Sequence, residues 1–179
     1  LTTEAWTHVL VFVASQHAAE HVTGKLVKAG IGTAALHGDL SQGTRSKALA
    51  DFKERRLRVL VATDLAARGV DIAQLPAVVN YDLPRSPSDY VHRIGRTGRA
   101  SDSGVAISFL TAESSAHFTL IERRNGLAIP REQVPGFEPR QEAVSLRDPN
   151  GGIKGKRKSK KDKLREAAAA AAGKPPEDE

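Results

Sequence analysis

The sequence predicts an α/β fold in which an open, mostly parallel sheet carries helices on both faces. Apolar, β-branched runs alternate with segments of helical periodicity from Val9 to Arg124, and such alternation is typical of parallel strands joined by helices. Three of the runs are almost continuous in Val, Ile, Leu and Ala, as buried strands are. The length of 179 residues suits one domain with a short appendage.

The elements follow in order along the chain. Strands are expected where β-branched runs occur, at residues 8–14, 33–36, 58–62, 77–81 and 105–110. Helices are expected where apolar residues recur at helical spacing, at residues 16–29, 42–55, 87–94 and 112–124. Ser15 and Ser41 stand where N-caps belong, and Gly30 and Gly126 where helices end. A further short helix is expected after Thr63.

The pattern changes after Pro130. Four prolines interrupt residues 130–149, which we expect to run over the surface as a strap, whereas residues 1–129 form the α/β domain. Residues 150–179 are expected to form a mostly disordered tail. Residues 151–179 contain 9 basic and 5 acidic side chains, and residues 1–150 contain 18 and 16. The high isoelectric point therefore describes the tail more than the domain.

Composition excludes several classes of protein. The chain has no Cys, which excludes disulfide scaffolds, zinc ribbons and thiol catalysis. Its longest apolar run, Val9–Ala14, is far shorter than the roughly 20 residues that a membrane span needs. We find no signal-peptide pattern and expect a cytoplasmic protein. The start at Leu1 instead of Met predicts that the chain belongs to a longer one.

The motif YVHRIGRTGRA, residues 90–100, has the strongest chemical pattern. Arg93, Arg96 and Arg99 recur every three residues with glycines between them. Arginine presents a planar fork that suits phosphate oxygens, and an arginine so placed can stabilise a transferring phosphoryl group. The alternative is that these arginines form surface ion pairs with Asp64, Asp82 or Asp89.

A second motif, VLVATDLAARGVDI, covers residues 59–72. Thr63 offers a hydroxyl at the carboxyl end of a strand, where a phosphate could lie near free backbone N–H groups. Asp71 could accept hydrogen bonds from paired ribose hydroxyls. Alternatively, Thr63 and Asp64 only cap the short helix.

Two weaker motifs lie at other strand ends. HGDLSQGTR places Gly38 and Asp39 in a tight loop and Arg45 in the first turn of the next helix. The helix dipole disfavours a cation there, so an anionic ligand would explain Arg45, although a solvated arginine would also fit. VLVFVAS ends in Ser15, whose hydroxyl could bind a ligand or only cap the helix.

These blocks, in this order and spacing, resemble the carboxyl-terminal RecA-like domain of DEAD-box ATP-dependent RNA helicases. HRIGRTGR and ATDLAARGVDI are highly specific, and NYDLP and GVAISFL add to the resemblance, which covers residues 8–140. The later PREQVPGFEP and the Lys-rich tail are most similar to the bacterial RhlE-type branch. The family usually has Thr where this chain has Ser15, which keeps the hydroxyl.

The resemblance implies roles for particular residues. Arg96 and Arg99 would reach the γ-phosphate of ATP as catalytic arginine fingers, and Asp71 and Gly69 would contribute to ATP binding. His92, Arg93 and Arg68 would couple this domain to an N-terminal RecA-like domain. The residues implied to contact RNA, through its backbone and without reading its sequence, are Ser15, Gly38, Asp39, Arg45, Thr63 and Gly69.

The sequence contains no G-x-x-x-x-G-K-[ST] loop and no DEAD motif. We expect these parts, and the ligands of the Mg²⁺ that accompanies ATP, on the N-terminal domain, so the isolated chain should not hydrolyse ATP. No metal site is expected here, because His17-Ala-Ala-Glu20-His21 matches a zinc motif without a third ligand.

The alternative function is a non-catalytic RNA- or protein-binding module. In a third interpretation the tail residues Lys154–Arg165, with eight basic side chains and one acidic, are the main RNA contact.

Overall fold

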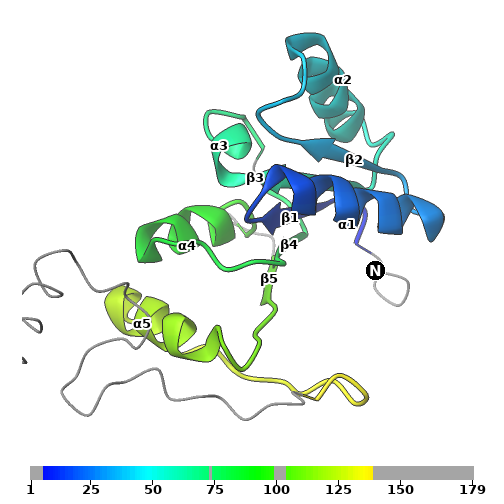
Figure 1. Ribbon diagram of the computed structural model, residues 1–179. Coiled ribbons are helices and arrows are strands. Elements are labelled where there is room, and N and C mark those ends of the chain that lie inside the picture. Colours follow the sequence, from blue (N-terminus) through cyan, green and yellow to red (C-terminus); the bar gives the residue numbers. More distant parts are fainter. Residues whose placement is uncertain (1–5, 73, 99–103, 139–179) are drawn as a thin grey trace, which may run out of the picture. The chain divides into compact units, whose positions relative to one another are not determined.

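The computed structural model describes residues 6–72, 74–98 and 104–138. Five strands form one parallel sheet in the order β2-β3-β1-β4-β5 (Figure 1). This arrangement confirms the predicted fold class. The strands are β1 (Val9–Val13), β2 (Thr33–Leu36), β3 (Val59–Thr63), β4 (Ala77–Asn80) and β5 (Val105–Ser108).

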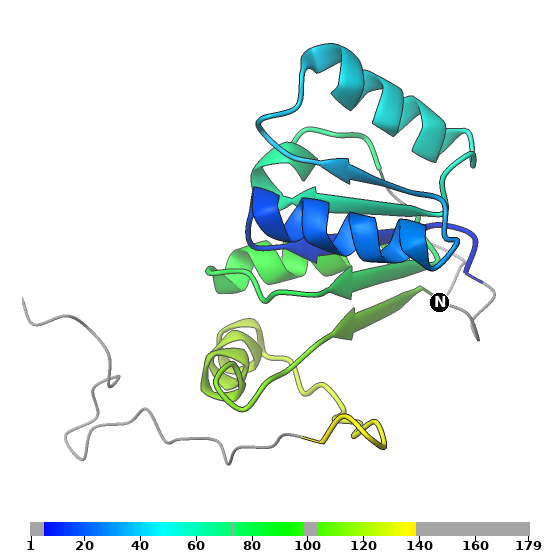
Figure 2. The same ribbon diagram turned by 45° about the vertical axis from the view of Figure 1, so that its right-hand side comes forward.

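Helices lie on both faces of this sheet, as Figure 2 shows. α1 packs Ala19 and Val22 on the face to which Val11 points, whereas α2 packs Phe52 on the face to which Leu10 points. Alternate residues of the central strand thus enter two separate cores, which explains its unbroken apolar run. The helices are α1 (Gln16–Lys28), α2 (Gln42–Lys53), α3 (Asp64–Ala67), α4 (Pro87–Ile94) and α5 (Ser115–Asn125).

The helix caps confirm the local predictions. The Ser15 hydroxyl accepts a hydrogen bond from the Ala18 N–H at 3.1 Å, and the Ser41 hydroxyl accepts one from the Thr44 N–H at 3.2 Å. α5 ends at Gly126 in the left-handed conformation, with φ of 64°. The C-cap of α1 is Ala29. Gly30, which the sequence predicted at this position, comes one residue later and has φ of 77°.

Some boundaries differ from the prediction. The last helix begins at Ser115, not at residue 112, because the preceding residues form a turn in which the Ser114 hydroxyl accepts from the Thr111 N–H at 2.8 Å. β4 ends at Asn80, since the next two N–H groups, of Tyr81 and Asp82, both donate to the carbonyl of Phe12. The chain therefore leaves the sheet one residue earlier than expected.

The first part of the predicted strap lies against α5. Ile129 packs on the cluster formed by α4 and α5, and the Arg131 guanidinium lies 4.6 Å from the centroid of the Phe118 ring. Arg131 also forms a two-point ion pair with Glu122, at 2.9 and 2.7 Å. The rest of the strap, residues 139–149, and the predicted tail, residues 150–179, lie outside the described residues. The domain boundaries stay a prediction.

No helix within the described residues is long and apolar enough to cross a membrane.

The ion pair on α5 predicts a measurable titration. The Arg131 guanidinium and, to a smaller extent, the Ile129 N–H lower the pKa of Glu122 from 4.5 to about 2. Because this pKa falls on folding, the pair stabilises the domain fully above pH 4.5 and loses its effect as the pH falls toward 2. Arg131→Gln should therefore return the pKa of Glu122 toward 4.5, as followed by NMR of its side-chain carboxyl. Arg123→Gln is the control, and an unchanged midpoint in Arg131→Gln would contradict this assignment.

Candidate functional site

Arg93 on α4 is the most connected side chain of the site. It is 2% exposed, and its Nε and Nη2 donate to the two carboxylate oxygens of Asp64 at 2.7 Å each. Its Nη1 donates to the side-chain oxygen of Asn80 at 3.0 Å and to the backbone carbonyl of Asp82 at 2.6 Å. A buried guanidinium with a two-point carboxylate partner is the geometry in which an ion pair withstands loss of water.

Asn80 extends this network toward the edge strand. Its amide is fully buried and donates to the hydroxyl of Ser108 on β5 at 3.1 Å, and the same hydroxyl lies 3.1 Å from that of Tyr90. Burial raises the pKa of the Tyr90 phenol, and the hydrogen bond with Ser108 opposes that rise. Arg93 also lies over the ring of Phe12, 4.8 Å from its centroid. The polar groups beneath the site are therefore satisfied.

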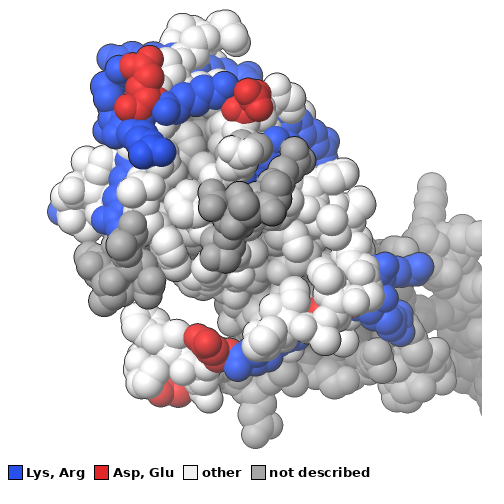
Figure 3. Space-filling view, turned by 180° about the vertical axis from the view of Figure 1, so that it is seen from behind, with Lys and Arg blue, Asp and Glu red and all other residues white. Residues whose placement is uncertain are grey.

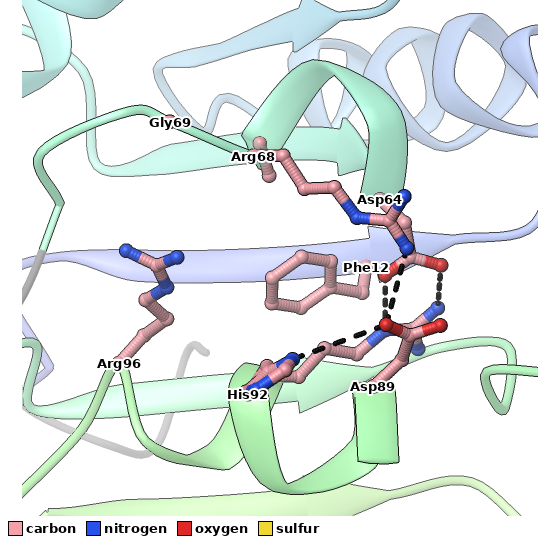
Figure 4. Close-up of a pocket in the computed structure, with 9 residues that line it drawn as sticks. Phe12, Asp64, Arg68, Gly69, Asp89, His92 and Arg96 are labelled. Carbon is pink, nitrogen blue, oxygen red and sulfur yellow. Dashed lines mark hydrogen bonds and ion pairs between the residues drawn. The ribbon is translucent and has the colours of Figure 1, made fainter. Parts of the chain in front are cut away.

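An open pocket of about 250 Å³ lies above this network. In Figure 4 the Phe12 ring forms its floor, with Arg96 on one side and the carboxylates Asp64 and Asp89 on the other. Asp89 accepts from Arg68 at 3.1 Å and lies 4.0 Å from the ring nitrogen of His92. Gly69, with φ of 72°, forms part of the rim and makes the turn after α3 in a conformation that favours glycine.

The half-buried Arg96 lies beside the loop that contains Asp71. Its Nη1 donates to the carbonyls of Val70 at 3.2 Å and of Ile72 at 3.4 Å, on either side of Asp71. The Asp71 side chain is 95% exposed, and its contact with Lys53 at 3.8 Å is an exposed ion pair of small energy. The structure thus brings together an arginine with weak neutral acceptors and an accessible carboxylate.

A second group of predicted residues lies at the carboxyl edge of the sheet. Val13 pairs with Thr63 in the register of β1 and β3, so Ser15 and Thr63 follow neighbouring strands at the same edge. Thr63 is the N-cap of α3 by position but makes no side-chain capping bond within the described residues. Its hydroxyl is therefore free of the capping role that the alternative interpretation assigned to it.

The loop after β2 extends this edge. Leu36 pairs with Ala62, which places Gly38 and Asp39 beside the end of β3. The Asp39 carboxylate accepts from the Gln16 side-chain amide at 3.1 Å, which ties this loop to α1. Arg45 lies in the first turn of α2 and is half-buried.

Basic side chains gather over α2, at the top of Figure 3, with acidic groups among them. Asp51 and Glu54 pair with Arg56 there and offset part of the positive charge. The cations of α2 and the loop after it are Arg45, Lys47, Lys53, Arg55, Arg56 and Arg58.

The structure separates the three arginines of the sequence motif. Arg93 forms the ion pair with Asp64 that the alternative interpretation named, although the guanidinium is buried and not on the surface. Arg96 lines the pocket, and Arg99 lies outside the described residues. Sequence reasoning did not identify Phe12 or Asn80 as parts of the site. A polar amide inside the apolar run AVVN was the available signal, since buried amides need partners.

The residues of this site fit a nucleoside phosphate. An arginine and an exposed carboxylate suit phosphate and ribose hydroxyls. Among the described residues, no three His, Asp or Glu side chains gather as a metal site would require.

Comparison with known proteins finds DEAD-box proteins both by sequence and by structure. The model of the helicase conserved C-terminal domain matches residues 1–101. The ATP-dependent RNA helicase RhlB of Pseudomonas syringae pv. tomato is 43% identical over 135 residues, 75% of this chain and 34% of that protein. This chain thus spans about a third of the length of that relative. The RhlE-type assignment stays a prediction.

Two solved structures are similar in fold. The E. coli DEAD-box protein SrmB, bound to the regulator of ribonuclease activity A, has a TM-score of 0.73 and 37% identity, covering 80% of this chain and 85% of that one. S. cerevisiae Dbp5 with a point substitution, bound to RNA and ADP BeF3, has a TM-score of 0.62 and 41% identity, covering 66% and 32%.

The buried ion pair predicts a large loss of stability on truncation. Arg93→Ala should lower the free energy of unfolding by about 3 kcal/mol or more, because it leaves Asp64 and Asn80 without their partner. Urea denaturation of this chain measures the loss. Arg124→Ala on the exposed end of α5 is the control and should stay within about 0.5 kcal/mol of the original chain. Equal stability of the two variants would refute a structural role for Arg93.

Proposed function

The chain belongs to the helicase conserved C-terminal domain family, and we propose that it acts as the C-terminal half of a DEAD-box RNA helicase that hydrolyses ATP. The observation that supports this most is the position of Arg96. It lies on an open pocket beside the loop that contains the exposed Asp71, and its described hydrogen bonds go only to neutral carbonyls.

The pocket supports half of a nucleotide site. Asp71 would accept hydrogen bonds from ribose hydroxyls, and Arg96 and Arg99 would stabilise the charge that develops on the transferring phosphoryl group. The sequence lacks a phosphate-binding loop, so the phosphates and Mg²⁺ would be held by an N-terminal RecA-like domain facing this pocket. ATP supplies the phosphoryl group that is transferred to water.

The carboxyl edge of the sheet supports an RNA groove. Ser15 and Thr63 offer hydroxyls, and Arg45 and the cations over α2 offer positive charge. These groups suit phosphates and 2′-hydroxyls, so binding would not depend on base sequence. Dbp5, to which this chain is similar, has a structure bound to RNA and ADP BeF3. We infer that closure of the two domains on RNA and ATP would strain a short duplex and open it.

A second candidate is a binding module that never hydrolyses ATP. The Lys-rich run at Lys154–Arg165 favours it, because a polycation binds RNA without needing the pocket or a second domain.

The arginine-finger proposal predicts a large loss of turnover. In the full-length protein that contains this chain, Arg96→Ala and Arg99→Ala should each lower RNA-stimulated ATP hydrolysis by ~10³-fold or more, because the transition-state charge loses a cation. Steady-state phosphate release measures the effect, with Arg123→Ala on α5 as the control. Turnover within tenfold of the original would refute the proposal.

Deleting residues 150–179 separates RNA binding by the groove from RNA binding by the tail. If the groove binds RNA, affinity for single-stranded RNA should fall only modestly and keep most of its value at raised salt. If the tail is the main contact, binding should vanish and, before deletion, should weaken steeply with salt. Fluorescence anisotropy of labelled RNA at several salt concentrations gives the answer.

A further inference from the structure

The two proposed contact regions, groove and pocket, meet at Asp82. Its carboxylate Oδ2 accepts a hydrogen bond from the Ala14 N–H at 2.8 Å, across from the end of β4 to the end of β1. The N–H groups of Tyr81 and Asp82 donate to the carbonyl of Phe12 at 3.0 and 3.2 Å. The ends of β1 and β4 are thus joined beyond the last paired residues of the sheet.

Ala14 is the residue before Ser15. The Ser15 hydroxyl already accepts from the Ala18 N–H, so its oxygen has a fixed partner on one side and its O–H can donate to a phosphate oxygen. The bond from Ala14 to a carboxylate is charge-assisted and stronger than a bond between neutral groups. It fixes the backbone immediately ahead of the hydroxyl, and with it the direction in which the hydroxyl faces.

Asp82 is also connected to the pocket. Its backbone carbonyl accepts from Arg93 at 2.6 Å, and Arg93 binds Asp64, the residue after Thr63. One continuous set of hydrogen bonds therefore joins the backbone ahead of Ser15 with the backbone that follows Thr63. Ser15 directly follows a residue that this set holds by its N–H, whereas Thr63 is linked to the set only through Asp64 and the backbone carbonyl of Asp82.

We propose that Asp82 is a positioning residue for RNA, and that its carboxylate holds the turn after β1 so that the Ser15 hydroxyl faces the phosphate backbone. This inference rests on the proposed function and adds a residue to its RNA groove. The half-buried side chain of Asp82 acts through Ser15 and does not itself touch RNA, since a carboxylate would repel phosphate.

The test compares Asp82→Ala, Asp82→Asn and the original in the full-length protein. Asp82→Ala should raise the RNA concentration for half-maximal ATP hydrolysis about tenfold, with the KM for ATP and the kcat at saturating RNA within about twofold. Asp82→Asn keeps an oxygen of the same shape and should remain within about twofold throughout. Glu113→Ala, which removes an exposed carboxylate ahead of α5, is the matched control. A purely structural role would lower kcat and leave the KM for RNA unchanged.

A double-mutant cycle with Ser15→Ala completes the test. If Asp82 acts through Ser15, adding Asp82→Ala to Ser15→Ala should raise the RNA requirement by less than twofold. Full additivity, or an unchanged RNA requirement in Asp82→Ala, would overturn the inference. If Asp82→Ala does not fold, Asp82→Ser replaces it, because a serine side chain is too short to reach the Ala14 N–H.

Failure of the proposed function can be told apart from failure of this inference, because Arg96→Ala would then leave turnover unchanged.

Discussion

The candidate site depends on one buried positive charge. The guanidinium of Arg93 is removed from water, so its hydrogen bonds must be met inside the protein. Its described partners come from the start of α3, the end of β4 and the loop after β4. Satisfying one side chain therefore fixes the start of α3 relative to the end of β4 and the loop that follows it, and these segments position the pocket and the edge of the sheet.

The parts of the fold that depend on local signals are predictable from the sequence. Unbroken apolar runs identify strands that are buried on both faces, and the structure places Leu10 and Val11 in separate cores. Ser15 and Ser41 cap their helices because a serine side chain can reach an N–H three residues ahead. These features depend on a few neighbouring residues, and the residues alone specify them.

The rest of the site depends on the order of the strands. Asn80 and Asp82 approach Phe12 and Ala14 because β4 lies next to β1. No local pattern in the sequence predicts that these two strands are neighbours. The late start of α5 has a different, local origin in the turn between Thr111 and Ser114. The arginine spacing predicted a phosphate site, yet spacing alone did not show which guanidinium would be buried.

The contrast between Arg93 and Arg96 follows from their acceptors. Both guanidiniums come from one motif, three residues apart, but Arg93 meets a carboxylate at 2.7 Å with two parallel bonds. Arg96 meets two backbone carbonyls at 3.2 and 3.4 Å. Neutral acceptors at those distances hold a cation in place without neutralising it. A phosphate oxygen is the stronger acceptor, and it would draw Arg96 from the carbonyls far more easily than it would draw Arg93 from Asp64. The same residue type thus serves the framework at one position and is available to a ligand at the next.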